Sequence, residues 1–242
     1  MSEVKRALVT GGSGDIGGAI CRALAARGHH VYVHAHANAA RAREVVTAIN
    51  ADAGTAEVVV FDITDATTTR SALDQLLLDG PIEVLVHNAG VHDDAPLAGM
   101  TDLQWRHVID VSLHGFFHVA QPLLLPMART RFGRIVAVSS VAAVLGNRGQ
   151  VNYAAAKSAL HGAAKSLARE MAARGVTVNV VAPGIIAGNM SAATFDAEQI
   201  RQLVPAARPG TPQEVAALVA FLCSADAGYV NGQVIGINGG MV

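Results

Sequence analysis

Short apolar runs alternate with longer segments of helical periodicity along almost the whole chain. The apolar runs have the length of strands and few polar interruptions, which is typical of strands buried on both faces. They predict strands at Arg6–Val9, Val31–Ala35, Glu57–Phe61, Val84–His87, Arg134–Val138, Thr177–Val181 and Gln233–Ile237. The segments between them predict helices at Ile16–Ala26, Ala39–Ala51, Thr67–Leu78, Asp102–Thr130, Val151–Ala173 and Pro212–Ser224.

Strict alternation of strands and helices predicts the fold class. Buried parallel strands need crossover helices, so we expect an α/β, Rossmann-like, doubly wound parallel sheet of about seven strands with helices on both faces. A length of 242 residues suits a single domain over 1–242. One long irregular stretch, Gly184–Thr211, contains a short helical pattern at Asp196–Leu203 and is expected to form a substrate lid. Its apolar residues either line that lid or pack in the ordinary way; they are Met190, Phe195, Leu203 and Val204.

Composition narrows the functional classes. Hydrophobic residues make up 51% of the chain and charged residues 15%, which supports a large core. A net charge of −1 argues against nucleic acid or an anionic membrane as a partner. The N-terminus shows no signal peptide and no apolar run reaches about 18 residues, so we expect a cytoplasmic protein without a membrane span. Cys21 and Cys223 lack metal-ligand spacing and are expected to be buried thiols, and we predict no metal site.

A tyrosine and a lysine with helical spacing are the first candidate for chemistry. Tyr153 and Lys157 are four residues apart, which places both side chains on one face of a helix. A tyrosine phenol ionises near pH 10, and an ammonium held close favours the phenolate and lowers that pKa. Ser140, 13 residues before the tyrosine, is able to hold the same substrate oxygen. Alone, the Tyr–Lys pair is more often a surface pair than a proton-transfer site for a carbonyl or an alcohol.

The turn after the first predicted strand is the second candidate. It is rich in glycine and leads directly into a helix, and it comprises Gly11, Gly12, Ser13, Gly14, Asp15, Ile16 and Gly17. Glycines let the backbone approach a pyrophosphate, and the helix N-terminus supplies amide donors and a positive dipole end. A lone G-x-G-x-x-G is often a plain turn, but here it lies in the strand–turn–helix setting that dinucleotide binding requires.

These motifs together resemble the short-chain dehydrogenase/reductase family. The matching segments are Thr10-Gly11 with Gly17, Asn88-Ala89-Gly90, the set Ser140, Tyr153 and Lys157, Pro183-Gly184, and Asn238-Gly239-Gly240. The similarity covers nearly the whole chain. Along Gly146–Gln150 and Val176–Gly184 the chain is most similar to the bacterial 3-oxoacyl-[acyl-carrier-protein] reductases of that family.

The resemblance implies a nicotinamide cofactor and a position for each of its parts. Asp62 and Ile63 match the adenine contact, and Asn88, Ala89 and Gly90 match the wall around the adenosine ribose. Pro183, Gly184 and Ile186 match the segment that holds the nicotinamide carboxamide. Because no acid stands near the end of the second strand before Glu44, and His36, Asn38 or Arg41 is able to bind or tolerate a 2′-phosphate, we expect NADPH. The alternative is that this histidine-rich loop is a solvated turn.

Three positions depart from the family pattern. Asp15 stands where the family has the middle glycine of Thr-Gly-x-x-x-Gly-x-Gly, and it either starts the helix favourably or repels a phosphate. Ser112 stands at the asparagine of the family's Asn-Ser-Tyr-Lys tetrad, where it either serves a water relay to the lysine or is a packed helical serine. Gly188 replaces a threonine that contacts the nicotinamide end.

The resemblance also implies an activity and partners. The expected reaction is NADPH-dependent reduction of a 3-oxoacyl thioester on acyl carrier protein, in fatty-acid synthesis or a related polyketide or polyene pathway. Arg131 and Arg174 match positions that face the acidic carrier, although both also suit helix ends. A homotetramer is expected. The alternatives are an oxidoreductase for a free alcohol, sugar or steroid, and a nucleotide-binding sensor without turnover.

Overall fold

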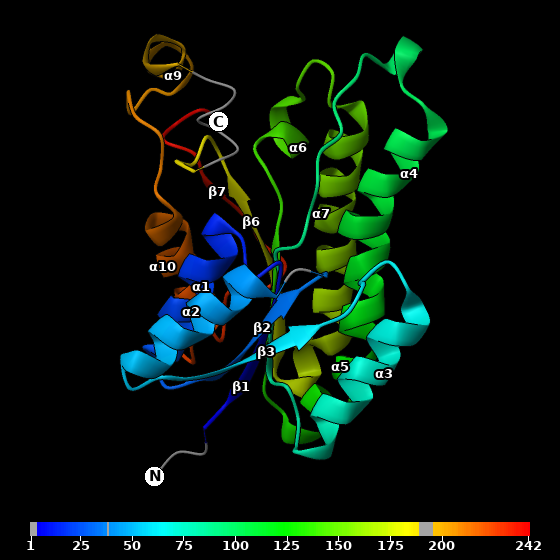
Figure 1. Cartoon of the computed structure of the whole chain (residues 1–242), viewed down its shortest axis with the longest axis vertical. Helices are drawn as coiled ribbons and strands as arrows, with labels where there is room; N and C mark the ends of the chain where they lie inside the picture. Colours follow the sequence, from blue (N-terminus) through cyan, green and yellow to red (C-terminus); the bar gives the residue numbers. More distant parts are fainter. Residues whose placement is uncertain (1–3, 38, 189–195) are drawn as a thin grey trace.

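A single parallel sheet of seven strands forms the centre of the molecule (Figure 1). The computed structural model describes residues 4–37, 39–188 and 196–242. The strand order is β3-β2-β1-β4-β5-β6-β7, and every neighbouring pair is parallel. The strands are β1 (Arg6–Thr10), β2 (His30–Ala35), β3 (Thr55–Val60), β4 (Val84–His87), β5 (Gly133–Val138), β6 (Val176–Pro183) and β7 (Val234–Ile237). The expected fold class is confirmed.

Helices cover the sheet in two layers, because each strand exposes apolar side chains to both faces. The helical segments are α1 (Asp15–Ala25), α2 (Ala40–Ala51), α3 (Ala66–Leu78), η1 (Leu97–Gly99), α4 (Asp102–Ile109), η2 (Asp110–His114), α5 (Gly115–Thr130), α6 (Ala142–Leu145), α7 (Val151–Met171), η3 (Ala172–Arg174), α9 (Ala197–Leu203) and α10 (Pro212–Leu222). Helices α1, α2 and α10 lie on one side of the sheet, and α3, α5 and α7 lie on the other (Figure 1). The sequence pattern missed α6, which is only a single turn.

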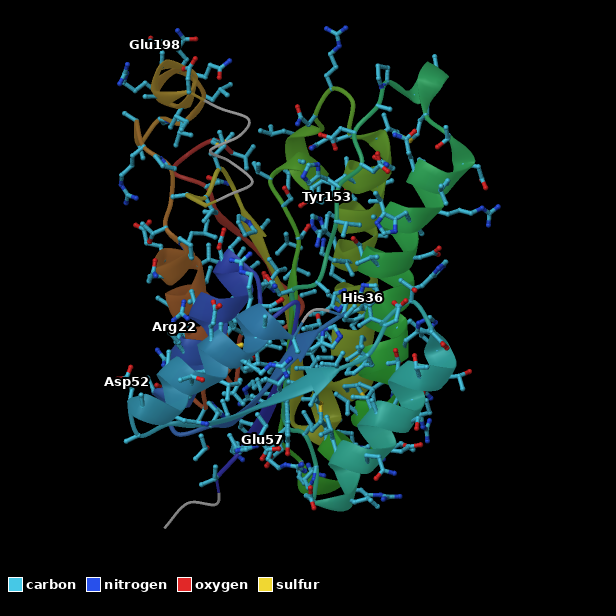
Figure 2. The ribbon with its side chains drawn as sticks, viewed as in Figure 1. Arg22, His36, Asp52, Glu57, Tyr153 and Glu198 are labelled. Carbon is cyan, nitrogen blue, oxygen red and sulfur yellow. The ribbon has the colours of Figure 1, made fainter. Side chains whose placement is uncertain are left out.

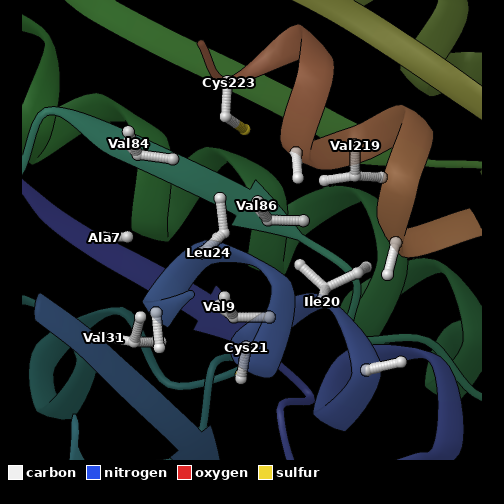
Figure 3. Packing of buried hydrophobic residues seen from close by; sticks show 14 of the residues in the cluster. Ala7, Val9, Ile20, Cys21, Leu24, Val31, Val84, Val86, Val219 and Cys223 are labelled. Atoms are coloured by element: carbon white, nitrogen blue, oxygen red, sulfur yellow. The ribbon is translucent and has the colours of Figure 1, made fainter. Parts of the chain in front are cut away.

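The two faces of each strand feed separate hydrophobic clusters. In β1, Val9 belongs to the cluster under α1 and α10, whereas the adjacent Leu8 belongs to the cluster under α3, α5 and α7. Figure 3 shows the first cluster, in which Ile20 and Leu24 of α1 face Val86 and Val219. Cys21 and Cys223 are buried among these residues, as expected, and burial raises the pKa of the Cys223 thiol to about 12. The burial of apolar side chains in these two clusters is the main favourable contribution to folding.

The helix predicted over Asp102–Thr130 is confirmed as one helical run. It contains a π-helical turn, η2, between α4 and α5, which the sequence pattern did not predict. At the start of α5, Gly115 packs on Ile63 so closely that a Cβ would lie 2.7 Å from the isoleucine side chain. Among the described residues this run alone is long and apolar enough to cross a membrane, but it packs on the sheet as a core helix does, so it is weak evidence for a span.

Side-chain caps begin several of the later helices but not the first one. Thr101 and Thr211 form capping boxes at α4 and α10, and Asp65 accepts amide bonds at α3. At α1 the N-cap is Gly14, and no side chain within the described residues accepts a bond from its first amides. An uncapped helix N-terminus after a buried strand has the donors and the dipole for an anion.

The strand order reverses between β1 and β4. From β1 the chain proceeds outward through β2 and β3, and it then returns to the other side of β1 with β4. In open parallel sheets the crevice outside the carboxyl ends at such a switch point is the usual ligand site. The fold therefore directs attention to the turn after Thr10 and to the residues after His87.

Two glycines of the turn after β1 provide the first prediction. A Cβ on Gly17 would lie 2.2 Å from the Gly11 carbonyl oxygen, whereas one on Gly14 would meet only that oxygen at 3.5 Å. Because backbone at 2.2 Å cannot yield without opening the turn, Gly17→Ala is expected to lower the free energy of unfolding by at least about 2 kcal/mol. Gly14→Ala is expected to change it by less than about 1 kcal/mol. Urea unfolding of the two variants measures both values, and equal losses would contradict this description of the turn.

Candidate active site at the carboxyl edge of the sheet

The glycine turn is held in a compact form by its own backbone. Gly11 has a φ of 63°, and the Gly14 amide donates to its carbonyl over 3.1 Å. A Cβ on Gly12 would lie 2.9 Å from Val33, so this position too has no room for a side chain. Ser13 and Ile16 are half-buried on the same turn. The predicted residues of the turn thus lie together at the start of α1.

Hydrogen bonds join this turn to the residues after β4. The Thr10 hydroxyl accepts the amides of Asn88 and Ala89, each over 3.1 Å. The Asn88 side-chain amide donates to the carbonyls of Thr10 and Gly11 over 3.2 and 3.1 Å. The side chain of Asn88 therefore shapes the turn. That Asn88, Ala89 and Gly90 form the wall around the adenosine ribose stays a prediction.

Two buried histidines support the same region. His34 Nε2 donates to the Phe61 carbonyl over 2.9 Å, so its Nδ1 is free to accept the Gly11 amide over 3.2 Å. His87 Nε2 donates to the Ser112 carbonyl over 2.9 Å, and its Nδ1 accepts the Thr10 hydroxyl over 3.3 Å. Burial lowers the pKa of His34 to about 4 and that of His87 to about 3, so both rings are neutral supports.

Neither histidine was a site prediction from the sequence. The available signal was a polar residue at the end of an apolar strand, which occurs in both cases. That signal indicates a buried hydrogen-bonded group but does not say which turn the group holds.

Ser140, Tyr153 and Lys157 meet at the carboxyl end of β5. The Ser140 hydroxyl accepts the Ala142 amide over 3.1 Å and is hydrogen-bonded to Tyr153. The Lys157 ammonium donates to the Val138 carbonyl over 2.9 Å and lies 5.9 Å from the centre of the Tyr153 ring. Figure 2 shows Tyr153 on the upper part of α7. The helical spacing thus brings the phenol and the ammonium to one edge of the sheet.

The pKa of the tyrosine moves in the direction opposite to the one expected. Burial raises the pKa of Tyr153, the bond with Ser140 lowers it, the charge of Asp94 raises it, and the net shift is upward. Lys157 was expected to lower it, but its ammonium is engaged by Val138, and burial lowers the pKa of Lys157 itself to about 8. At neutral pH the phenol therefore keeps its proton, which suits a proton donor.

Gly90 links the lysine to the position of the tetrad asparagine. A Cβ on Gly90 would lie 2.7 Å from Lys157 Nζ and 3.7 Å from Ser112 Oγ. The Ser112 hydroxyl is completely buried and has no hydrogen-bond partner among the described residues. A buried hydroxyl without a hydrogen-bond partner lowers the stability of the folded chain. A polar group bound beside Gly90 would therefore be stabilised by a hydrogen bond with Ser112. A relay role for Ser112 stays a prediction.

The residues expected near the adenosine of the cofactor are His36, Asp62 and Ile63. His36 lies beyond β2 in Figure 2, and its Nε2 is 3.4 Å from Asp62 Oδ2. Burial would raise the pKa of Asp62, but bonds from Thr64 and the nearby His36 lower it overall. The side chain of Ile63 is buried, and its carbonyl accepts His118 Nδ1 over 2.8 Å. A contact between Ile63 and the cofactor stays a prediction.

The segment after β6 lies beside the C-terminus. The Pro183 carbonyl accepts the Val141 amide over 2.7 Å, next to Ser140. A Cβ on Gly184 would lie 2.8 Å from Asn238, so only glycine at position 184 lets this segment pack against the Asn-Gly-Gly motif. Ile186 pairs with Gly210 in an isolated parallel bridge.

Part of the predicted lid lies outside the described residues. The lid residues Met190 and Phe195 lie there, and so does Asn38, a candidate for the 2′-phosphate. Of the other two lid residues, Val204 is buried against Gly239, which is ordinary packing, and Leu203 is 48% exposed. A lid over 184–211 stays a prediction.

Arg131 and Arg174 lie close together but far from Tyr153. Both line one surface hollow, and a Cβ on Gly175 would lie 2.1 Å from the Arg131 carbonyl. Arg131 precedes β5 and Arg174 precedes β6, so they lie at the amino ends of these strands. Tyr153 lies at the carboxyl ends. Within one chain, therefore, the two arginines and the tyrosine are at opposite ends of the sheet.

The arrangement defines a class of protein. A compact glycine turn followed by an uncapped helix N-terminus fits a dinucleotide diphosphate, because Gly11, Gly12 and Gly17 have no room for a Cβ and the first amides of α1 are available as donors. Beside it lie a protonated phenol, a serine hydroxyl and an ammonium. Together these groups suit a nicotinamide-dependent oxidoreductase that protonates the oxygen of a carbonyl.

Comparisons with known proteins agree with this class. A family model described as "Enoyl-(Acyl carrier protein) reductase" matches residues 12–242. The chain is 42% identical over 243 residues to the 3-oxoacyl-[acyl-carrier-protein] reductase FabG of Escherichia coli, covering 99% of this chain and 98% of the relative. It is 41% identical to that of Haemophilus influenzae, covering 98% of each, and 40% identical to that of Staphylococcus aureus, covering 100% and 99%. The chain belongs to the short-chain dehydrogenase/reductase family.

The buried lysine leads to a prediction about stability and pH. Below pH 8 Lys157 is charged in both the folded and the unfolded chain, so the full cost of burying it is present; between about 8 and 10.5 the folded chain is neutral first and the cost fades. Lys157→Met is therefore expected to raise the free energy of unfolding by about 1–3 kcal/mol near neutral pH, after the loss of its hydrogen bond. The gain should shrink as the pH rises above 8, which urea unfolding at several pH values measures.

The matched control is Lys165→Met, because Lys165 is exposed on the same helix. This variant should show no gain that depends on pH. If Lys157→Met instead lost stability equally at every pH, the buried ammonium would not be under an electrostatic penalty.

Proposed function

We propose that this protein reduces the 3-oxo group of an acyl thioester carried on acyl carrier protein, with NADPH as the hydride donor. The observation that carries the proposal is the meeting of Ser140, Tyr153 and Lys157 beside the glycine turn, with Lys157 against Gly90. Support for the substrate class comes from relatives of about the same length that are named 3-oxoacyl-[acyl-carrier-protein] reductases. The pathway is fatty-acid synthesis or a related polyketide or polyene synthesis.

Each of the three side chains has a definite task in this reaction. When bound, the nicotinamide supplies a hydride to the substrate carbonyl carbon. Tyr153 donates its phenolic proton to the carbonyl oxygen. Ser140 uses its hydroxyl proton to bond the same oxygen, because the hydroxyl oxygen already accepts the Ala142 amide. Lys157, with a pKa of about 8, is largely charged at neutral pH, and its ammonium is proposed to bond the ribose of the nicotinamide.

NADPH is the proposed form of the cofactor. The first residue after β2 that is available to a 2′-substituent is His36, which is 72% exposed, rather than an acid. Asp62 is nearby but is bonded to Thr64 and paired with His36. Arg41 is paired with Asp15 over 3.0 Å, so it is a weaker candidate for the phosphate than the sequence suggested.

We propose that this protein forms a homotetramer and that the carrier docks on the arginine surface around Arg131 and Arg174. Because these arginines lie at the opposite end of the sheet from Tyr153, a carrier held there would serve the site of another copy. Such an arrangement requires an oligomer in which the Tyr153 of one copy lies near the arginine surface of another, as the proposed homotetramer would provide. A cytoplasmic location stays a prediction.

The central test is NADPH consumption with a 3-oxoacyl carrier-protein substrate. Tyr153→Phe is expected to lower kcat about 10²- to 10⁴-fold, because the proton donor is lost, while the dissociation constant for NADPH changes little. Tyr229→Phe is the control, because the side chain of Tyr229 is fully exposed.

The same assay separates the alternatives. Near wild-type turnover in Tyr153→Phe would remove the proposed acid. A clear preference for NADH, or for free ketones over carrier substrates, would replace that part of the proposal. Binding of NADPH without oxidation across a broad substrate panel would favour a sensor.

The arginine surface gives a second prediction. Reversing both charges in Arg131→Glu/Arg174→Glu is expected to raise KM for the carrier substrate about tenfold or more, because rim charges guide association. KM for a small 3-oxoacyl ester should stay within about twofold, since it needs no docking surface. Steady-state kinetics with both substrates measure this, together with light scattering to follow the oligomer.

Arg22→Glu serves as the control for a reversed charge, because Arg22 is exposed on α1, on the other side of the sheet. An equal rise in KM for both substrates, or no rise for the carrier substrate, would show that these arginines do not hold the carrier.

A further inference from the structure

Two of the departures from the family pattern meet in space. Asp15 begins α1, and Gly188 lies in the segment after β6. A Cβ on Gly188 would lie 2.6 Å from Asp15 Oδ2 and 3.3 Å from its Cγ. No real Cβ approaches an oxygen this closely, so the Asp15 carboxylate occupies the space that a side chain at position 188 would take.

Glycine at 188 is not required by the backbone. The glycines with positive φ among the described residues do not include Gly188. An alanine would therefore be conformationally acceptable there, and the nearest obstacle to its Cβ among the described residues is the Asp15 carboxylate. The absence of a side chain at 188 and the presence of one at 15 are thus complementary.

The charge of Asp15 is balanced from a third element. Arg41, near the start of α2, donates to Asp15 Oδ1 over 3.0 Å, while Oδ2 is the oxygen beside Gly188. The carboxylate also lies in the first turn of α1, where the helix dipole favours a negative charge. Of the two readings open from the sequence, this geometry favours a side chain that starts the helix over one that turns into the glycine cradle.

We propose that Asp15 is a positioning residue that joins the start of α1 to the segment after β6, and that position 188 is glycine in order to admit its carboxylate. The two elements flank the crevice at the diphosphate end and at the nicotinamide end, so the contact sets the distance between them. The ligand in this inference rests on the proposed function. A side chain at 188 would displace the carboxylate from this position. The displaced negative charge would then repel the diphosphate.

The test is a double-substitution cycle read out by cofactor binding. Gly188→Ala is expected to raise the dissociation constants for NADPH and NADH about fivefold to tenfold, measured by fluorescence titration of the full-length protein. In the Asp15→Gly background, where no carboxylate is displaced, the same substitution should change them less than about twofold. Equal factors in the two backgrounds would overturn the pairing of these residues.

Arg41 is tested by comparing the two cofactors. Arg41→Ala leaves the Asp15 charge unbalanced, so it should weaken NADPH and NADH by similar factors, and Asp15→Asn in the same chain should restore both. A loss confined to NADPH would instead assign Arg41 to the 2′-phosphate and overturn its role as the counter-charge.

A readout without cofactor separates this inference from the proposed function. In the cofactor-free protein, Gly188→Ala should lower Tm in the wild-type background and leave it unchanged in the Asp15→Gly background. Gly99→Ala is the control, because a Cβ there meets nothing within 4 Å. If the wild type bound neither dinucleotide, the proposed function would fail, while the coupling in Tm would still decide whether the contact exists. Loss of that coupling would overturn the inference.

Discussion

The hydrogen bonds that tie Thr10 and Gly11 to Asn88 and Ala89 are the constraint on which the site depends. They join the carboxyl ends of β1 and β4, where the strand order reverses and parallel strands leave their terminal groups unpaired. The same short segment after β4 ends in Gly90, which lies against Lys157. The distance between the glycine turn and the Ser140, Tyr153 and Lys157 group is therefore set by a few backbone atoms rather than by flexible side chains.

Much of the fold was predictable because its information is local. Buried strands need continuous apolar runs and crossover helices need one apolar stripe, so the order of the elements follows from the pattern. The spacing of Tyr153 and Lys157 works in the same way, since helix geometry alone places them on one face. The π-helical turn at η2 was not predicted because its residues have ordinary helical composition, and it accompanies a tertiary contact, the His87–Ser112 bond, that the local pattern does not reveal.

Other features depended on groups that are distant in the sequence. The direction of the Tyr153 pKa follows from burial and from Asp94, neither of which the Tyr–Lys spacing reveals. The roles of His34 and His87 depend on which carbonyl lies opposite each ring. Likewise, Asp15 and Gly188 read as two separate anomalies in the sequence, and only their juxtaposition makes them one feature.

The neutral histidines under the glycine turn also contribute to the way the protein's stability changes in acid. Each has a pKa near 6.5 when unfolded but about 4 or 3 in the folded chain, so below pH 6.5 the unfolded chain takes up protons that the native core refuses. Each ring then withdraws about 1.4 kcal/mol of stability for every further unit of acidification until its own folded pKa is reached. Part of the loss of stability in acid therefore arises in the interior, beneath the crevice, in addition to any contribution from charges on the surface.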